Sequence, residues 1–231
     1  MHKGTSASAG IGIGKVTIVS DAQLTIKKET VADTAAEMER FKSALERFIA
    51  DTNALAEDMA VRIGEKEAEI LIGQTFMMQD PELTGAIEGA ITGEHVNAEF
   101  AVETVCNMYA DIFASMEDEL MQQRAADLKD IKTRIQKILM GVKEFTVSSL
   151  PEGSVIVAKD LTPSITAGIN PANVAGIVTE LGGKTSHTAI LARALEIPAV
   201  VAVSGILEAA ADGDPIVVDG TKGQVFIKPE P

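Results

Sequence analysis

Residues 176–198 read GIVTELGGKTSHTAILARALEIP, and this stretch decides the fold class. It starts with the β-branched run Ile177-Val178-Thr179, turns at two glycines, and continues with apolar residues at helical spacing. A strand, a glycine turn and a helix in this order form the repeating unit of α/β domains. We therefore expect this segment to belong to a domain in which helices pack on a sheet.

The rest of the C-terminal half repeats the alternation of strands and helices. Short β-branched runs lie at 155–157, 199–203, 216–218 and 224–227. Helical patterns lie between several of these runs, at 163–169, 186–196 and 206–211. The last two runs are joined by Asp-Gly-Thr-Lys-Gly at 219–223, which predicts a hairpin.

The opening segment, residues 11–19, also has the pattern of a strand. Its glycines invite comparison with a GxGxxG dinucleotide fingerprint, but Lys15 stands where the third glycine is needed and no helical pattern follows. A lone strand needs a hydrogen-bonding partner, and the C-terminal sheet can supply one. We therefore predict a discontinuous α/β domain made of residues 1–25 and 144–231.

The intervening residues, 26–143, have a helical period. Thr34 and Glu37 predict a capping box, Asp80-Pro81 predicts a helix start, and Gly93 and Gly141 predict helix ends. Asn97 is expected to cap another helix, whose apolar stripe extends to Leu120. Other apolar stripes start at Met38 and Leu128, and a further helical run covers 65–79. These patterns predict an inserted all-helical bundle with short connections.

Composition narrows the class of protein. The 231 residues are 46% hydrophobic and 3% aromatic, and the formal net charge of −14 disfavours nucleic acid and anionic membranes as partners. The single cysteine, Cys106, excludes a disulfide within the chain. No apolar run approaches the roughly 18 residues of a membrane span, and the N-terminus lacks a signal-peptide pattern. We expect a cytoplasmic protein.

His187 is the side chain in this sequence best placed for chemistry. Thr185 or Ser186 is a natural N-cap, which puts His187 in the first helical turn, where free backbone N–H groups and the helix dipole favour an anion. Gly182 and Gly183 let a ligand approach the backbone closely. This setting fits a nucleophilic histidine that becomes a phosphohistidine.

Other interpretations of this segment are less complete. Gly-Lys-Thr at 183–185 resembles the end of a Walker A loop, but Val178 stands where that motif needs glycine. Metal binding has little support, because the other two histidines, His2 and His95, show no ligand spacing with His187. An ordinary helix-capping or surface histidine remains the alternative that the residues alone allow.

The segment GGKTSHTAILAR resembles the GGxTSHxAIxAR signature of phosphohistidine domains in phosphoenolpyruvate-utilising enzymes. The wider chain resembles the N-terminal half of the Enzyme I family of the bacterial phosphoenolpyruvate:sugar phosphotransferase system. Further matching stretches lie at 7–11, 124–127 and 160–164. The resemblance implies a swivelling β/β/α phosphohistidine domain interrupted by an inserted helical subdomain that docks the phosphocarrier protein HPr.

The same resemblance implies a phosphoryl relay. The signature histidine of the family accepts phosphate originating from phosphoenolpyruvate on Nε2 and passes it to HPr, which is the first step of sugar uptake. His187 occupies that position, and Thr166 matches a threonine whose hydroxyl bonds the active imidazole. Two alternatives stay open. One is the swivelling domain of a pyruvate phosphate dikinase or phosphoenolpyruvate synthase relative, and the other is a non-catalytic docking module.

Two further groups of residues follow from the family pattern. Those expected to surround the phosphate are Gly183, Lys184, Thr185, Ser186 and Arg193. Arg193 follows His187 by six residues, about 120° around the helix, so we expect it to brace the domain rather than clamp phosphate. The positions matching the HPr contact are Glu65, Phe76, Met77, Glu82 and Arg124, although Phe76 and Met77 could instead be bundle core.

Enzyme I binds phosphoenolpyruvate and Mg²⁺ in a C-terminal barrel domain, for which this sequence has no counterpart. We therefore expect a piece of a longer protein, monomeric by itself, with no metal or cofactor of its own. Such a piece should not react with phosphoenolpyruvate directly. It should still exchange phosphoryl groups with phosphorylated HPr, because that step needs only the histidine domain and the docking subdomain.

Overall fold

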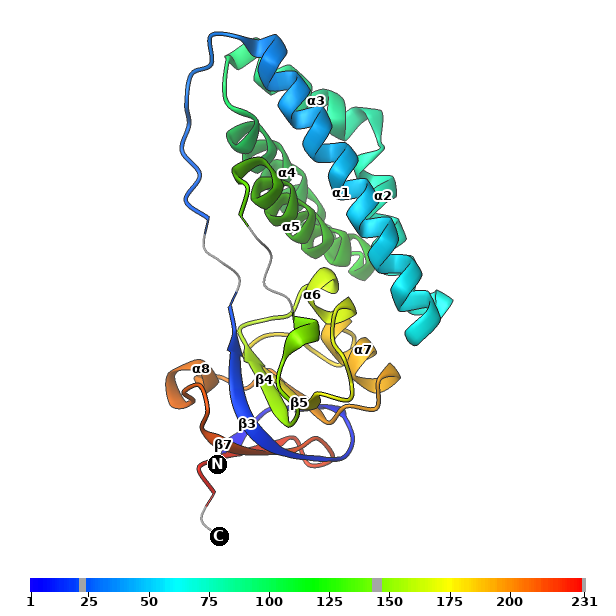
Figure 1. The fold of residues 1–231 in the computed structure, drawn as a ribbon, viewed down its shortest axis with the longest axis vertical. Coiled ribbons are helices and arrows are strands. Elements are labelled where there is room, and N and C mark those ends of the chain that lie inside the picture. Colours follow the sequence, from blue (N-terminus) through cyan, green and yellow to red (C-terminus); the bar gives the residue numbers. More distant parts are fainter. Residues whose placement is uncertain (21–23, 143–146, 230–231) are drawn as a thin grey trace. The chain divides into compact units, whose positions relative to one another are not determined.

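A computed structural model describes residues 1–20, 24–142 and 147–229. The chain divides into two compact units, Met1–Asp21 with Phe145–Pro231 and Ala22–Glu144 (Figure 1). The sequence placed the two boundaries at 25/26 and 143/144, and the second of these lies outside the described residues. The α/β fold with an inserted helical subdomain is confirmed.

An eight-stranded mixed sheet forms the frame of the first unit, with strand order β1-β8-β7-β3-β4-β5-β6-β2. The strands are β1 (His2–Lys3), β2 (Thr5–Ser8), β3 (Ile11–Val19), β4 (Ser154–Ala158), β5 (Val174–Thr179), β6 (Ala199–Val201), β7 (Pro215–Asp219) and β8 (Gln224–Ile227). Strand β3 lies parallel to β4 and antiparallel to β7, so the opening strand belongs to the C-terminal sheet as predicted. The β7–β8 hairpin is also confirmed.

Apolar side chains cover both faces of the central strands. Along β4, Ile156 packs in one cluster with Ala189 of the helix α7 (His187–Ala194), whereas Val155 and Val157 pack in another with Ile206 of α8 (Ile206–Ala209). A third short helix, α6 (Pro163–Ala167), packs against α7. Burial on both faces explains why these strands consist of continuous β-branched runs.

Gly12 and Gly14 of β3 have a structural explanation. A Cβ at Gly12 would lie 2.0 Å from the carbonyl oxygen of Ala175, and one at Gly14 would lie 2.0 Å from that of Gly153. The glycines therefore permit close approach of neighbouring backbone. The pattern that resembles a dinucleotide fingerprint serves packing of the sheet.

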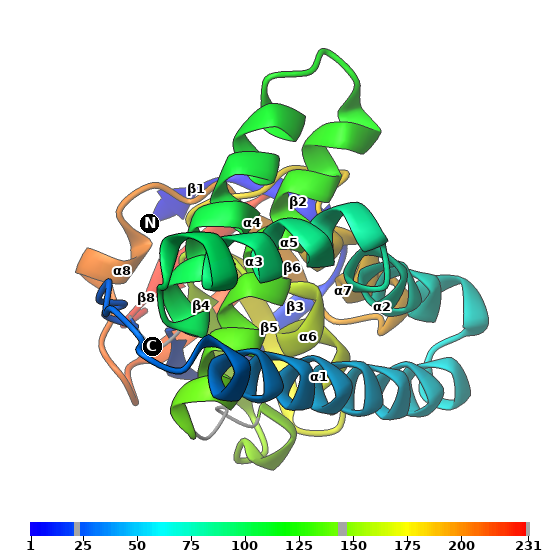
Figure 2. The same ribbon diagram turned by 90° about the horizontal axis from the view of Figure 1, so that it is seen from above.

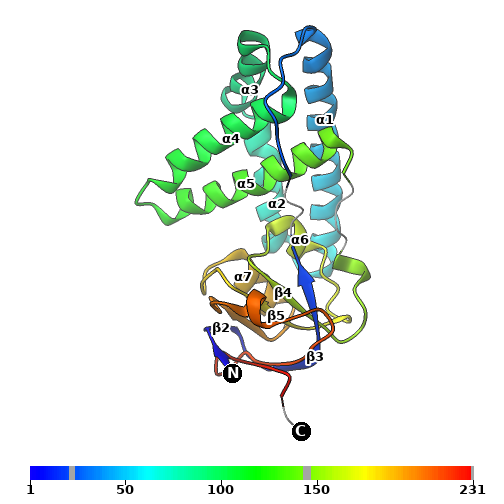
Figure 3. The same ribbon diagram turned by 90° about the vertical axis from the view of Figure 1, so that its left-hand side faces the viewer.

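The second unit is a bundle of five helices within residues 24–142 (Figures 2 and 3). Their bounds are α1 (Thr34–Arg62), α2 (Glu65–Met78), α3 (Pro81–Glu94), α4 (Ala98–Ala114) and α5 (Glu119–Met140). Phe41, Phe48, Ile87, Ile131 and Ile135 are fully buried in its core. Asp80 caps α3 and Gly141 ends α5, as the sequence predicts.

Three details of the helical prediction are wrong. The N-cap of α1 is Asp33, which accepts a hydrogen bond from Ala36 N, so Thr34 and Glu37 form no capping box. Helix α3 continues one residue beyond Gly93, to Glu94, and Leu120 lies in α5 rather than at the end of the α4 stripe. Glu37 is buried and accepts from Ala98 N instead, because tertiary partners outcompete the local cap.

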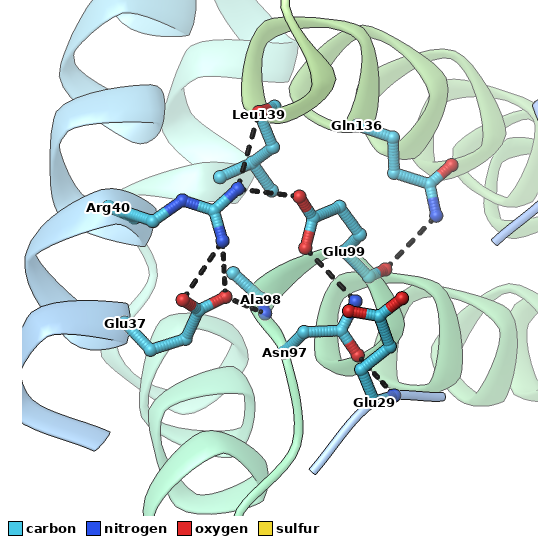
Figure 4. A network of polar contacts seen from close by, with 8 residues as sticks. All are labelled: Glu29, Glu37, Arg40, Asn97, Ala98, Glu99, Gln136 and Leu139. Carbon is cyan, nitrogen blue, oxygen red and sulfur yellow. Dashed lines mark hydrogen bonds and ion pairs between the residues drawn. The ribbon is translucent and has the colours of Figure 1, made fainter. Parts of the chain in front are cut away.

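Glu37 belongs to a polar network at one end of the bundle (Figure 4). The Arg40 guanidinium donates to both oxygens of Glu37 at 2.7 and 2.9 Å, to Glu99 Oε1 at 2.6 Å and to the Leu139 carbonyl at 3.3 Å. The hydrogen bond with Glu37 contributes most to a raised pKa of Arg40. Burial acts to raise the pKa of Glu99, but backbone hydrogen bonding and Arg40 lower it on balance.

Asn97 extends this network to the segment before α1. Its Oδ1 accepts from Glu29 N at 3.0 Å, its Nδ2 donates to Glu99 Oε2 at 3.1 Å, and its own N–H donates to the Glu29 carbonyl at 3.1 Å. The predicted position of Asn97 before α4 is correct, but its side chain makes no cap hydrogen bond. The network fastens α1, α4, α5 and the entering segment together.

Arg40→Ala should lower the free energy of unfolding by about 2 kcal/mol, because it leaves the buried Glu37 without its cation. The pKa of Glu99 is lowered in the folded state, so that part of the stabilisation exists above its ordinary value of 4.5 and is lost as pH falls. Urea unfolding at neutral pH and at about pH 3.5 should therefore show a smaller difference between variant and wild type in acid.

Arg47→Ala is the matched control for this prediction. Arg47 pairs with Asp51 at 3.5 Å between exposed side chains, so its loss should cost less than about 0.5 kcal/mol. Equal losses in the two variants would show that the network adds nothing beyond a surface ion pair.

Candidate functional site

The candidate site surrounds the first residue of α7, His187. Ser186 is the N-cap, and its Oγ accepts from Ala189 N at 3.3 Å and donates to the Gly183 carbonyl at 2.9 Å. Ser186 N donates to the same carbonyl at 3.1 Å. Of the two predicted caps, the structure selects Ser186 over Thr185, and His187 stands where the helix N-terminus favours an anion.

The glycine turn before α7 is open on one side. Gly182 has a φ of +100°, a conformation that favours glycine, and a Cβ at Gly183 would meet nothing within 4 Å. Lys184 and Thr185 are exposed at this turn. The backbone of the turn is therefore accessible to a small ligand.

Helix α7 is tied to the loop that follows β4. The hydroxyl of the buried Thr188 donates to the Leu161 carbonyl at 3.3 Å, and Leu181 N donates to the Lys159 carbonyl at 2.9 Å. Asp160 lies between these two attachment points, and His187 is among the charges that act on its carboxyl. His187 thus lies where the loops after β4 and β5 meet, half-buried as a residue and with both ring nitrogens buried.

Thr166 is buried in α6, the helix that packs against α7. Its hydroxyl donates toward the carbonyl oxygens of Thr162 and Pro163, each at 3.0 Å. These contacts orient the Thr166 oxygen and leave lone pairs for a further donor. The expected hydrogen bond with the imidazole of His187 stays a prediction.

Arg193 reaches backbone on two sides. Its Nη1 donates to the Ala7 carbonyl of β2 at 3.0 Å and to the Lys184 carbonyl at 3.1 Å. One guanidinium thus holds the glycine turn against an edge strand. This is the bracing position that the 120° offset from His187 predicts.

The predicted partner-binding residues lie in the helical unit. Glu65 begins α2 and Glu82 lies in the first turn of α3, both exposed, and Glu82 Oε1 accepts from the Tyr109 hydroxyl at 3.3 Å. Phe76 is 67% exposed, which contradicts the bundle-core alternative for this residue. Met77 packs against the bundle core, which agrees with the bundle-core alternative for this residue.

Arg124, the fifth predicted partner-binding residue, is half-buried in α5. Its Nη1 lies 3.5 Å from Asp127 Oδ2 and would lie 2.9 Å from a Cβ at Gly73. Gly73 and Phe76 lie on the same helix, α2. Arg124 thus covers α2 next to the exposed apolar pair Ile72 and Phe76.

The sequence pattern does not identify two of the residues at the site as functional. Asp160 and Thr188 lie inside stretches that match the family pattern, but only the fold shows that Thr188 bonds the Leu161 carbonyl of the β4 loop and that His187 interacts with the Asp160 carboxyl. Among the described residues, no group of three His, Cys, Asp or Glu side chains could hold a metal ion. No helix in the described ranges could cross a membrane.

Comparison with family models assigns both parts of the chain. Residues 3–124 match the N-terminal domain of PEP-utilising enzymes, and residues 150–223 match the mobile domain of PEP-utilising enzymes. The second match contains the glycine turn, His187 and Arg193.

Curated relatives cover nearly the whole chain. It is 41% identical over 227 residues to a phosphoenolpyruvate-protein phosphotransferase of Listeria innocua and 39% identical to that of Bacillus subtilis. Each alignment covers 98% of this chain and 40% of the relative. The chain therefore spans about 40% of the length of these relatives.

Solved structures agree with this assignment. The NMR solution structure of an Enzyme I protein (nEIt) matches with a TM-score of 0.82 at 39% identity, covering 100% of this chain and 94% of that one. The N-terminal domain of Enzyme 1-Nitrogen matches with a TM-score of 0.65 at 25% identity, with the same coverage. The similarity includes both compact units.

Proposed function

Because this chain belongs to the PEP-utilising enzymes, as the N-terminal portion of an Enzyme I, we propose that His187 relays phosphoryl groups to the phosphocarrier HPr. The observation that carries the proposal is the position of His187. It is the first residue of α7, directly after a glycine turn, inside the segment matched to the mobile domain. Ser186 is the N-cap of α7, so His187 is not itself the capping residue.

The relay is a balanced exchange. A lone pair on Nε2 of His187 attacks phosphorus, a new P–N bond forms, and the bond to the donor breaks with its electron pair leaving on the donor. In transfer to HPr, the P–N bond at His187 breaks, its electron pair returns to the imidazole, and a histidine of HPr forms the new P–N bond. No net redox change or hydrolysis occurs.

The surrounding residues have separate roles in this proposal. Thr166 accepts from the N–H of the other imidazole nitrogen, so that Nε2 is the neutral nucleophile. The backbone of Gly183, Lys184, Thr185 and Ser186 surrounds the phosphoryl group at the helix N-terminus. Arg193 keeps the turn in place through its two carbonyl contacts.

The helical unit supplies the docking face for HPr. Exposed Phe76 provides an apolar contact, and the acidic residues Glu65 and Glu82 complement a partner with basic residues around its active site. Met77, which packs against the bundle core, and Arg124 of α5 are the other two contact positions in this proposal. In this proposal phosphoenolpyruvate and Mg²⁺ bind outside this chain, and we expect the chain to be cytoplasmic and monomeric.

The direct test is phosphoryl exchange. Incubation of this chain with HPr that carries a radiolabelled phosphohistidine should label the chain with acid-labile, alkali-stable phosphate, and unlabelled HPr should remove it again. Phosphoenolpyruvate alone should give no label. Absence of label from phosphorylated HPr would refute the relay.

A further inference from the structure

Asp160 is held beside the start of α7 by backbone contacts on both of its sides. Strands β4 and β5 are parallel neighbours, so the loops that follow them leave the same edge of the sheet. The carbonyl of Lys159 accepts from Leu181 N at 2.9 Å, and the carbonyl of Leu161 accepts from the Thr188 hydroxyl at 3.3 Å. Residues 159–161 are therefore attached to the glycine turn and to the neighbour of His187.

The Asp160 carboxyl lies in an environment that disfavours its charge. Burial raises its pKa above the ordinary 3.8, and the hydrogen bond from Leu161 N at 2.9 Å and the charge of His187 offset this only in part. Among the described residues, no Lys or Arg forms an ion pair with Asp160. A desolvated carboxylate without such a cation costs stability, which calls for a functional explanation.

The charged side chains near His187 have different surroundings. Lys184 is exposed, and Arg193 is engaged by two backbone carbonyls. The Asp160 carboxyl, in the adjacent loop, is close enough to His187 for the two groups to interact electrostatically. A phosphoryl group on the imidazole adds further negative charge in the neighbourhood of this carboxylate.

We propose that Asp160 is a positioning residue that raises the phosphoryl-transfer potential of His187 through repulsion between its carboxylate and the phosphoryl group. The proposal rests on the relay function given above. Repulsion destabilises phosphorylated His187 relative to phosphorylated HPr, so it favours delivery of the phosphoryl group over its retention. Asp160 forms no bond to phosphorus and exchanges no proton in this role.

The test is the equilibrium constant of phosphoryl exchange between this chain and HPr. Asp160→Asn removes the charge and keeps an oxygen that can accept from Leu161 N. The equilibrium should shift about tenfold toward the phosphorylated chain. Asp160→Glu, which restores the charge, should return it most of the way to wild type.

Asp212→Asn is the matched control. Asp212 lies in the same unit, is exposed, and accepts from Ile18 N through its carboxylate. This variant has the same net charge as Asp160→Asn, and its exchange equilibrium should equal that of wild type. A tenfold shift of the exchange equilibrium in both variants would mean that the effect comes from the net charge of the chain, and it would overturn the assignment to Asp160.

Stability separates a charge effect from a structural one. The pKa of Asp160 is raised in the folded state, so its ionised form costs stability as pH rises through its titration. Asp160→Asn should therefore unfold in urea at an equal or higher concentration than wild type at neutral pH. A lower midpoint, or an unchanged exchange equilibrium in a chain that still takes label, would overturn the proposal. Failure of the wild type to take label would instead refute the relay itself.

Discussion

His187→Ala should take no acid-labile phosphate from phosphorylated HPr, a loss of at least about 10³-fold in labelling rate. The variant removes the nucleophile and leaves the cap intact, since Ser186 Oγ still accepts from Ala189 N. Folding should be preserved, because alanine is a good helix former and His187 lies at the first position of α7. The labelling rate is measured by taking samples with equal amounts of protein over time and determining the phosphate that acid releases from each.

The other histidines supply controls for this result. His2 lies in β1 and His95 is the exposed left-handed residue that ends α3. Replacement of either by asparagine should leave labelling unchanged. Ser186→Ala should label more slowly and lose about 1 kcal/mol of stability through the missing cap, but it should still label. Label on His187→Ala at the wild-type rate would place the phosphoryl group elsewhere.

The parts of the fold that could be predicted from sequence are those with a local signature. The β-branched runs predict β4 to β8, and the 3.6-residue period predicts the helical insertion. The order strand, glycine turn, helix predicts the placement of His187. No local pattern predicts strands β1 and β2, because they are short runs of polar and small residues that become strands only through pairing with β8 and β6.

Errors in the helical unit have a tertiary cause. Glu37 matches the local pattern of a capping box, but its carboxylate accepts from Ala98 N, 61 residues away, and from Arg40. Asp33, adjacent to Thr34, takes the capping role instead. A local hydrogen bond and a distant one compete for the same oxygen, and sequence pattern shows only the local competitor.

In the candidate site, too, some features can be predicted from neighbouring residues and others depend on tertiary contacts. Ser186, His187 and the open glycine turn follow from adjacent residues. The role of Arg193 can be predicted only in part. Helical spacing shows that Arg193 does not lie on the same face of α7 as His187, but it does not identify the Ala7 and Lys184 carbonyls as its partners. The link from Asp160 to His187 depends on the pairing of β4 with β5, which no single segment encodes.

Glu65→Lys combined with Glu82→Lys should lower kcat/KM for transfer from phosphorylated HPr about 100-fold. Each reversal turns an attraction toward a basic partner into repulsion, and one tenfold factor for each charge corresponds to about 1.4 kcal/mol per site. The effect should appear mainly in KM and should shrink as salt increases, because exposed charges are screened. Stopped-flow or quenched-flow labelling over a range of HPr and salt concentrations measures it.

Glu39→Lys combined with Glu46→Lys is the control with the same change in net charge, placed on exposed positions of α1. It should leave kcat/KM within about threefold of wild type, since charge away from the contact acts only at long range. Glu65 and Glu82 also interact favourably with the N-termini of their helices, each by about 0.3–1 kcal/mol. A urea unfolding curve of each double variant therefore has to show that a loss of stability does not cause the kinetic effect.

Labelling by phosphoramidate, a small donor that needs no docking face, distinguishes docking from chemistry. The Glu65 and Glu82 double variant should label at the wild-type rate with phosphoramidate and slowly with HPr, because His187 and its turn belong to the other unit. Equal slowing with both donors would mean that the reversals damage the site around His187. Unchanged kinetics with HPr would remove Glu65 and Glu82 from the docking face, while the relay at His187 would stand.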